Sequence, residues 1–438
     1  MEFVDRKKEL GLLRSIRETA KTSARLTVLK GRRRVGKTSL LQQAYGDEDF
    51  LYFFVARKNE ADLCRDFGAE ISRYLGVSLP GEASSFESVF RFLMELSQTR
   101  HFTLVIDEFQ DFLRIDSSVF STMQRDWDRL KSGSKINLVV CGSINRMMEQ
   151  IFSANQPLYG RATNEIDLMP FSTTTVKEIL SSRKPDCPKD ALLALWAFTG
   201  GVAKYAELLM DNGAFTVEDM VGAMVSEGST IPNEGKVILV DEFGKDYATY
   251  FSILSLIASG RTARAEIQNV TGCDIGGYLT KLESDYRLVT KKVPFGADGR
   301  NRNMKYELTD NFLRFWFRFI YKYQALLELR AYERLREIIL RDYAVFTGKA
   351  LESYFIAKFS ESGRYTRLGN WWDRKGENEI DIVAVDDIGQ KIDFYEIKRR
   401  ESRYDEEKLR RKAEAFFKVS GQYSDYEKGF SGLSINDM

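Results

Sequence analysis

Residues 25–45 read RLTVLKGRRRVGKTSLLQQAY, and this stretch decides the fold of the N-terminal half. Its first five residues, RLTVL, form a β-branched and aliphatic run that is typical of a buried strand. The next residues, Gly31 to Thr38, fit the pattern G-x-x-x-x-G-K-[ST], and a helical composition follows. A strand, a glycine-bounded loop and a helix in this order predict a loop that binds phosphate groups.

Each part of the loop has a physical task in the predicted site. Gly31 and Gly36 allow the backbone to curl so that its N–H groups face phosphate oxygens, at the positive end of the next helix. Lys37 is expected to reach the β- and γ-phosphates, and Thr38 to offer a hydroxyl to Mg²⁺. Arg32–Arg34 either contact phosphate or lie in solvent, and the sequence leaves both readings open. The predicted nucleotide-binding residues of the loop are Gly31, Arg32, Arg33, Arg34, Val35, Gly36, Lys37, Thr38 and Ser39.

A pair of acids ends a second apolar run, FTLVIDE, and Asp107 follows Lys37 by 70 residues. A strand buried in a parallel sheet emerges at its carboxyl end, which is where such sheets bind ligands. We expect Asp107 to hold Mg²⁺ and Glu108 to act as the general base that polarises the attacking water. The alternative is a plain acidic pair on the surface at the end of a strand.

Two further residues are candidates for the same site. The run INLVVC (136–141) predicts another strand, so Ser143 is expected beside the γ-phosphate, although it could equally be an ordinary turn serine. Arg161, in PLYGRATNEIDL, is a candidate for stabilising charge on the transferring phosphoryl group, with a solvated or structural arginine as the alternative. The predicted catalytic residues are therefore Glu108, Lys37, Arg161 and Ser143.

The whole chain has 438 residues, enough for two to four domains, with 43% hydrophobic and 29% charged residues, which indicates a globular protein. The net charge of +1 excludes a uniformly basic surface, so any contact with nucleic acid would involve local patches. Four separated cysteines give no zinc or disulfide pattern and are typical of a reducing compartment. With neither an apolar signal segment nor 18 consecutive apolar residues, the expected location is cytoplasmic and no membrane contact is expected.

Strand-like runs alternate with helical patterns over residues 1–165, which predicts an α/β domain with a parallel sheet. The segments FVDRKKELGLL, GRRRVGKTSL, LVIDEFQ, VVCGS, PLYGR and TGGVAKY, in this order, resemble the archaeal-type ATPases of the AAA+/STAND group. The resemblance implies ATP or ADP with Mg²⁺ as ligands, and residues 166–238 as a helical lid. It also implies that the segment F-x-x-R-x-x-E-L packs on adenine, through Phe3, Val4 and Arg6. One departure is Ala203, where relatives usually carry proline after Gly200-Gly201-Val202.

Residues 239–323 read as three helices followed by two strands, the succession of a winged helix, and the same ATPase family carries one there. Its basic side chains could lie near DNA phosphates. The third helix, however, offers a single lysine against two acids, so use as a protein-packing module is an equal alternative. The candidate phosphate contacts are Lys281, Lys291, Lys292, Arg300 and Arg302.

Residues 324–438 contain a second group of chemically active side chains. Asp381 begins one apolar strand, and 15 residues later Glu396 and Lys398 lie on one face of the next strand. Carboxylates and a lysine in this arrangement could hold Mg²⁺ and stabilise charge on a phosphodiester. The pattern, completed by Glu352 on a preceding helix, resembles the PD-(D/E)xK nuclease core, which implies a nuclease-like α+β fold. Cleavage itself stays open, because such folds also serve as binding modules.

The sequence therefore predicts a Mg²⁺-dependent ATPase that acts as a nucleotide switch, with the ATPase core, lid, winged helix and nuclease-like domain in this order. Two downstream functions remain open. In one, the protein acts on DNA through its C-terminal half. In the other, it is a signalling or scaffold ATPase whose inactive tail binds a protein partner or a second copy.

Overall fold

The computed structural model describes residues 3–46, 50–81, 84–243, 247–297 and 303–438. The chain divides into two compact units, Glu2–Met169 and Pro170–Met438. The sheets and the apolar clusters of one unit are distinct from those of the other.

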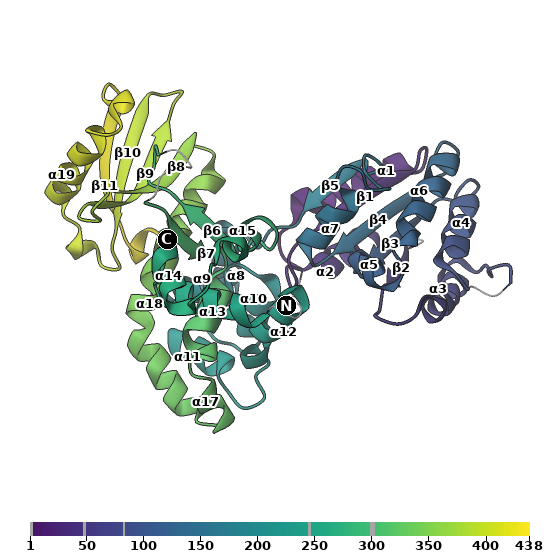
Figure 1. Cartoon of the computed structure of the whole chain (residues 1–438), viewed down its shortest axis with the longest axis horizontal. Coiled ribbons are helices and arrows are strands. Elements are labelled where there is room, and N and C mark those ends of the chain that lie inside the picture. Colours follow the sequence, from purple (N-terminus) through teal and green to yellow (C-terminus); the bar gives the residue numbers. More distant parts are fainter. Residues whose placement is uncertain (1–2, 47–49, 82–83, 244–246, 298–302) are drawn as a thin grey trace. The chain divides into compact units, whose positions relative to one another are not determined.

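A five-stranded parallel sheet is the centre of the N-terminal unit (Figure 1). The strands lie side by side in the order β2-β3-β4-β1-β5, which places the end of β4 between the ends of β1 and β3. β3 and β4 are buried along their whole length, as expected of central strands that are covered on both faces. The strands are β1 (Arg25–Lys30), β2 (Phe50–Phe54), β3 (Phe102–Asp107), β4 (Ile136–Gly142) and β5 (Asn164–Asp167).

Alternate strand residues serve two separate apolar clusters, because successive side chains point to opposite faces of a sheet. Val28 and Ile106 belong to one cluster, together with side chains of α3, α4 and α6. Leu29 and Val105 belong to the other, together with side chains of α1 and α2. The helices of this unit are α1 (Lys7–Ala20), α2 (Lys37–Tyr45), α3 (Glu60–Leu75), α4 (Phe86–Leu96), η1 (Phe109–Asp111), α5 (Phe112–Ile115), α6 (Ser118–Leu130) and α7 (Asn145–Phe152).

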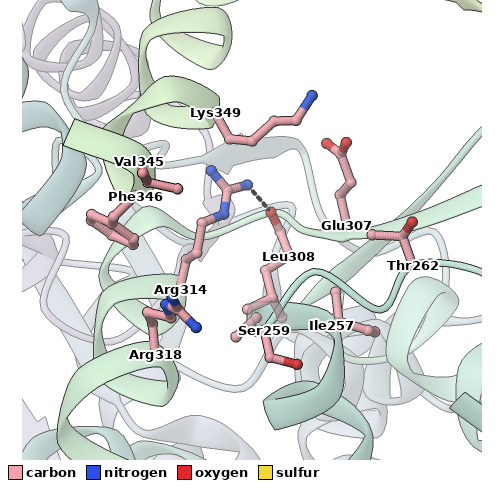
Figure 2. Close-up of a pocket in the computed structure, with 11 residues that line it drawn as sticks. Ile257, Ser259, Thr262, Glu307, Leu308, Arg314, Arg318, Val345, Phe346 and Lys349 are labelled. Atoms are coloured by element: carbon pink, nitrogen blue, oxygen red, sulfur yellow. Dashed lines mark hydrogen bonds between the residues drawn. The ribbon is translucent and has the colours of Figure 1, made fainter. Parts of the chain in front are cut away.

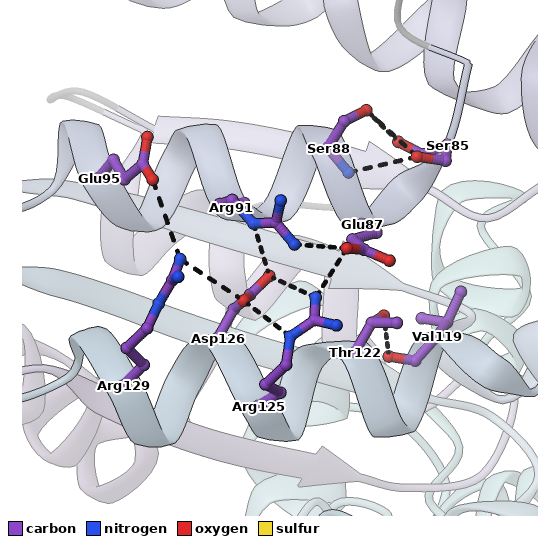
Figure 3. Close-up of polar contacts among 10 residues, drawn as sticks. All are labelled: Ser85, Glu87, Ser88, Arg91, Glu95, Val119, Thr122, Arg125, Asp126 and Arg129. Atoms are coloured by element: carbon purple, nitrogen blue, oxygen red, sulfur yellow. Dashed lines mark hydrogen bonds and ion pairs between the residues drawn. The ribbon is translucent and has the colours of Figure 1, made fainter.

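An ionic network joins α4 and α6 on the outer side of this unit (Figure 3). Asp126 is fully buried, and guanidinium nitrogens of Arg125, Arg91 and Arg129 lie 3.3, 3.4 and 3.7 Å from its carboxylate. Arg125 also contacts Glu87 at 2.7 Å. A buried carboxylate requires such partners, because removing them leaves an uncompensated charge. The network therefore fixes α6, the helix that leads into β4.

Five helices begin the second unit: α8 (Thr173–Arg183), α9 (Lys189–Thr199), α10 (Ala203–Asp211), α11 (Val217–Met224) and α12 (Ile231–Phe243). α9 is apolar on all sides and buried from Ala191 to Thr199. The turn that follows it has left-handed glycines, and at Gly201 a side chain would lie 2.5 Å from the Phe171 carbonyl oxygen. α8 to α11 lie within residues 166–238, where the resemblance of the sequence implies helices.

Three helices and a two-stranded antiparallel hairpin follow, in the order that the sequence predicts. They are α13 (Tyr247–Ala258), α14 (Arg264–Thr271), α15 (Gly276–Ser284), β6 (Val289–Lys292) and β7 (Lys305–Leu308). The aromatic run after the hairpin forms α16 (Asn311–Phe315) and a π-helical turn, η3 (Trp316–Tyr321), and its rings are mostly buried. Two separate helices follow, α17 (Gln324–Glu328) and α18 (Tyr332–Ser362).

A four-stranded mixed sheet with the order β11-β10-β9-β8 completes the unit (Figure 1). Its strands are β8 (Arg367–Trp372), β9 (Glu379–Asp386), β10 (Lys391–Ile397) and β11 (Glu427–Leu433), and α19 (Glu406–Phe417) packs on it through Leu409, Ala413 and Phe416. The sequence predicted β9 and β10 but not β8 or β11. No helix in the described part of the chain is both long and apolar enough to span a membrane.

Candidate nucleotide site and a C-terminal carboxylate cluster

The glycine loop between β1 and α2 has the geometry that its sequence predicts. Gly36 is left-handed, with φ 97°, and immediately precedes the first residue of α2. Gly31 lies so close to Leu168 that a Cβ atom would be 2.7 Å from the Leu168 carbonyl oxygen. Thr38 and Ser39 are exposed in the first turn of α2. The amides that begin α2 are thus presented at the carboxyl edge of the sheet, where an anion is favoured.

Lys37 occupies the centre of this loop. Its ammonium group donates to the carbonyl oxygens of Gly31 at 2.7 Å and of Arg32 at 3.2 Å. Burial lowers the pKa of Lys37, and the nearby negative charges of Asp107 and Glu108 partly offset that effect. A buried cation whose partners are mostly neutral carbonyls can gain much from a bound anion, because its charge is poorly solvated.

Asp107 ends β3 and lies across the end of β4 from the loop. The Thr38 hydroxyl donates to Asp107 Oδ2 at 3.4 Å, and the Tyr52 hydroxyl of β2 donates to the same oxygen. Burial and the adjacent carboxylate raise the pKa of Tyr52, so this phenol stays a donor. Asp107 and Thr38 present hard oxygen ligands of the kind that Mg²⁺ prefers, so the residues present fit a magnesium ion.

Glu108 has a left-handed backbone, with φ 53°, which is unusual for a residue with a side chain. Its Oε2 atom accepts a hydrogen bond from the Ser143 hydroxyl at 2.8 Å and another from the Gln110 amide nitrogen. Ser143 follows β4, and Gln110 is almost fully buried in η1. The structure thus brings Ser143 to Glu108, and two donors from different elements orient the carboxylate.

The N-terminal segment contacts the loop through Arg6. This buried guanidinium donates to the Met169 carbonyl oxygen at 2.7 Å and to the Val35 carbonyl oxygen at 3.4 Å. Burial lowers the pKa of Arg6. Its contacts within the protein support the loop, while Phe3 is exposed and Val4 is partly buried. A role for these three residues in contacting nucleotide stays a prediction.

Arg161 lies at the opposite end of the sheet from the loop. It precedes β5 by three residues, and Thr163 pairs with Leu26 near the start of β1. The rise of about 3.3 Å per strand residue separates this edge from the loop by roughly 15 Å. Arg161 donates to Asp128 at 2.9 Å and to the Tyr159 carbonyl oxygen at 2.7 Å. The structure therefore does not bring Arg161 to the loop of its own chain, and a catalytic role for Arg161 stays a prediction.

Comparison with known proteins agrees with this geometry. Residues 3–209 match a family described as an ATPase domain predominantly from Archaea. The match and the loop geometry support a P-loop ATPase domain in this part of the chain. Residues 316–410 match a second family, described as archaeal and bacterial proteins of unknown function, which assigns no activity to the C-terminal half.

Three relatives of the ATPase domain and its neighbouring segments show how far the likeness extends. An uncharacterized protein of Methanocaldococcus jannaschii is 27% identical over 442 aligned residues, covering 98% of this chain and 94% of that protein. A Walker-type ATPase of Pyrococcus abyssi is 20% identical and covers 72% of this chain and 96% of its own, with a TM-score of 0.54. The ORC2 protein of Aeropyrum pernix, solved in ADPNP–ADP complexes, is 13% identical over 74% of this chain and 96% of its own, with a TM-score of 0.51. At these identities the two solved structures show a shared fold.

Beyond the ATPase domain, the structure brings together the carboxylates and lysine that the sequence singled out in the C-terminal sheet. Lys398, just after β10, lies 3.0 Å from Glu396 and 3.8 Å from Asp381. Glu352 projects from α18, where Lys349 contacts it at 2.8 Å. Burial raises the pKa of Glu352, and the charge of Asp381 raises it further while Lys349 opposes the shift. These contacts define a carboxylate cluster of Glu352, Asp381, Glu396 and Lys398.

The two strand acids of the carboxylate cluster differ in their surroundings. Burial raises the pKa of Asp381, although the Ile397 N–H donates to it at 2.7 Å. Burial also acts to raise the pKa of Glu396, but hydrogen bonds from Lys398 and Lys412 outweigh it and hold the value low. The second oxygen of Glu396, Oε2, is buried and has no hydrogen-bond partner. Within the described ranges, no group of three or more His, Cys, Asp and Glu side chains is arranged to hold a metal ion.

The hairpin β6–β7 packs against the C-terminal sheet through its lysines. Lys292 contacts Glu307 at 2.7 Å and the Asn370 side chain at 3.1 Å, and Asn370 donates to the Asp381 carbonyl oxygen at 2.6 Å. Lys305 contacts Glu379 at 3.3 Å. Of the predicted phosphate contacts, Lys292 is thus engaged within the protein, Lys291 is half-buried and Lys281 is exposed, while Arg300 and Arg302 lie outside the described residues.

Sequence reasoning missed four contacts that shape these sites: Tyr52, Gln110, Asn370 and Lys412. Tyr52 could have been found from the alternation in FLYFFV, which places it on a strand beside β3. Gln110 carried a weaker signal, since it follows the acid pair by two residues. Asn370 and Lys412 depend on the unpredicted strand β8 and on the docking of α19, so no local pattern indicates them.

Proposed function

We propose that the N-terminal unit binds ATP with Mg²⁺ and hydrolyses it, with Lys37 on the phosphates, Thr38 and Asp107 on the metal, and Glu108 as the base. The observation that carries this proposal is the meeting of three strand ends. The loop after β1 presents Lys37 and amides, β3 presents two acids, and β4 presents Ser143.

The residues of this chain perform distinct parts of the proposed reaction. The loop amides and Lys37 bind the triphosphate, because fixed donors in a preorganised site stabilise negative charge without reorganisation. Glu108 takes a proton from the attacking water, and its two hydrogen bonds orient the carboxylate for that transfer. When bound, the magnesium ion supplies charge neutralisation on the phosphate oxygens.

A nucleotide switch follows from the same arrangement. Ser143 and Gln110 both donate to Glu108, so a change at the phosphate site would alter the hydrogen bonds made by the end of β4 and by η1. Such segments are the usual means by which a γ-phosphate and its hydrolysis change protein conformation. This step lies beyond hydrolysis itself and needs its own test, nucleotide-dependent protection of the helices at residues 171–230 in hydrogen exchange.

The binding step is tested by Lys37→Ala. Equilibrium binding of a fluorescent ATP analogue should fall below detection, because the loop loses its only buried cation among the described residues 31–38. Lys30→Ala is the matched control, since Lys30 ends β1 just before the loop but contacts Glu165 at 3.2 Å. Equal affinity for ATP in the Lys37→Ala and Lys30→Ala proteins would remove the phosphate-binding assignment.

A second function is favoured by the carboxylate cluster: Mg²⁺-dependent contact with a phosphodiester, and its cleavage. Asp381 and the unpartnered Oε2 of Glu396 offer oxygens to a cation, and Lys398 lies where it can stabilise negative charge. The order α18, β8, β9, β10, α19 and β11 is consistent with the nuclease-like fold that the sequence resembles. Against DNA binding by the hairpin, Lys292 and Lys305 are engaged by the protein itself.

Nicking of supercoiled DNA in the presence of Mg²⁺ and ATP tests this second function. Asp381→Ala should abolish nicking, whereas Asp393→Asn, on the other face of neighbouring β10, should retain it. If the wild-type protein nicks no form of DNA and shows no salt-dependent DNA affinity, the C-terminal half is a binding module for a protein partner or a second copy. Nucleotide-controlled self-association would then be the expected behaviour.

A further inference from the structure

A cavity of about 190 Å³ lies in the second unit where α13, β7, η3 and α18 meet (Figure 2). Ile257, Leu308 and Phe346 give it an apolar floor, and all three are buried. Its charged lining comes from Arg314 of α16, Arg318 of η3, Lys349 of α18 and Glu307 of β7, three cations and one anion. The volume would hold roughly six waters, which is too small for a drug-sized ligand and right for a small polar group.

Among the cations that line the cavity, Arg314 has the least neutralised charge. Its guanidinium donates to the Leu308 carbonyl oxygen at 2.9 Å, the bond drawn in Figure 2, and to the Asn311 side chain at 3.2 Å. Both acceptors are neutral, and no carboxylate oxygen of the described residues lies within 4.0 Å of this guanidinium. Burial lowers the pKa of Arg314, with Glu307 and Glu352 acting in the other direction. Cations this poorly solvated are normally paired with an anion.

The other charges around the cavity leave an excess of positive charge. Arg318 has only a 3.9 Å contact, to Asp342, whereas Lys349 contacts Glu352 at 2.8 Å. The one anion of the lining, Glu307, is neutralised from outside the cavity by Lys292 at 2.7 Å. An anion entering the cavity therefore meets Arg314 and Arg318 as cations without a close carboxylate.

The backbone at Arg318 is also unusual. η3 is a π-helical turn, and its side chains Trp316, Phe317, Phe319 and Ile320 are buried, while Arg318 is 26% exposed. π-helical turns are rare and frequently occur at functional sites, because the inserted residue redirects a side chain. Here the turn anchors four apolar side chains and leaves the guanidinium at the cavity.

We propose that this cavity binds a phosphate group, as inorganic phosphate or as the terminal monoester of a larger molecule. A planar guanidinium donates two parallel hydrogen bonds to a phosphate, and two guanidinium groups with an ammonium nearby suit its double charge. The apolar floor lowers the local dielectric and strengthens these bonds. The site is separate from the nucleotide loop, and the proposal requires neither ATP hydrolysis nor DNA cleavage.

Two sources of the phosphate are compatible with this chemistry. Lys349 belongs both to the cavity and, through Glu352, to the carboxylate cluster. A 5′-phosphorylated nucleic-acid end could therefore place its phosphate in the cavity beside that cluster, and a free phosphate or small phosphomonoester could bind alone.

Isothermal titration of inorganic phosphate into the full chain carrying Lys37→Ala tests the proposal, because that substitution removes phosphate binding at the nucleotide loop. Saturable binding is expected, and adding Arg318→Gln should weaken it about tenfold or more, the worth of one charge-assisted hydrogen bond. Arg318→Lys should lose less, since the charge remains. Arg341→Gln is the matched control: Arg341 contacts the same Asp342, at 2.8 Å, but does not line the cavity.

Competition identifies the source. Displacement of phosphate by a 5′-phosphorylated oligonucleotide but not by its 5′-hydroxyl counterpart would support the nucleic-acid end, and displacement by neither would support a small free phosphate. No saturable binding of phosphate, or equal weakening by Arg318→Gln and Arg341→Gln, would overturn the proposal. Lys349→Gln changes a lining residue on a different element, α18, and should also weaken the binding of phosphate.

Discussion

Gln110→Met is the substitution that isolates the orientation of the proposed base from nucleotide binding. Gln110 is 1% exposed, and its amide nitrogen donates to Glu108 Oε2 while Ser143 donates to the same oxygen at 2.8 Å. Methionine has a similar shape and no amide, so the change removes one of the two donors and leaves the loop, Lys37 and Thr38 untouched.

The expected magnitude follows from the kind of bond that is lost. A hydrogen bond to a charged group is worth about 1.5–3 kcal/mol, and about 1.4 kcal/mol corresponds to a tenfold change in rate. If orientation of Glu108 is needed in the transition state, kcat should fall by about 10- to 100-fold. Stability should change little, because the side-chain oxygen of Gln110, Oε1, is buried without a hydrogen-bond partner and the substitution removes it together with the amide nitrogen.

The assay is steady-state phosphate release, paired with equilibrium binding of an ATP analogue. We expect the dissociation constant to stay within about twofold of the wild-type value while kcat falls, since the lost contact acts on the base alone. Ser143→Ala should behave similarly, and the double variant should show a non-additive loss because both groups act on one oxygen. A Gln110→Met protein with wild-type kcat would refute the orienting role of this hydrogen bond.

Three further substitutions test other parts of the account. Arg161→Ala should leave ATP turnover of the isolated chain within about twofold of the wild-type value. It should also raise the pKa of Asp128, which the Arg161 hydrogen bond holds low. A tenfold loss of turnover would contradict the placement of Arg161 away from the loop. Glu352→Gln should stabilise the protein near pH 7, because burial raises the pKa of Glu352 and folding then opposes its ionisation. That gain should vanish as the pH falls below the ordinary glutamate pKa, and a thermal-melt series that shows a gain independent of pH would contradict this cause. Lys292→Met should destabilise the protein by about 1–3 kcal/mol in urea unfolding, because Glu307 and Asn370 lose a shared partner. The control Lys281→Met, on the exposed face of α15, should change the free energy of unfolding by no more than about 0.5 kcal/mol. Equal effects of the two substitutions would show that the hairpin does not depend on Lys292.

The nucleotide site was predictable because its signals are local. A strand followed by Gly31–Thr38 and a helix fixes the loop, and an apolar run that ends in Asp107 and Glu108 fixes a neighbouring strand end. The strand β5 escaped prediction because NEID is short and polar, and its pairing with β1 comes from the tertiary fold. The position of Arg161 was not predictable for the same reason, since only the position of β5 shows which edge of the sheet it occupies.

The C-terminal cluster was predictable in its members but not in its balance of charge. Alternation along β10 places Glu396 and Lys398 on one face, as the sequence indicates. The contribution of Lys412 depends on how α19 packs on the sheet, and that of Lys349 on its place in α18 beside Glu352. The hydrogen bond from Lys292 to Asn370 joins residues 78 positions apart, and Asn370 lies on β8, a strand that no periodic pattern predicts.

Single-turnover hydrolysis by Glu108→Gln tests whether Glu108 activates the water that attacks ATP. Glutamine keeps the size of the side chain and removes its ability to accept a proton. ATP should stay bound to the variant with near wild-type affinity, while release of phosphate should fall by at least about a hundredfold. Phosphate release at the wild-type rate from the Glu108→Gln protein would exclude Glu108 as the general base.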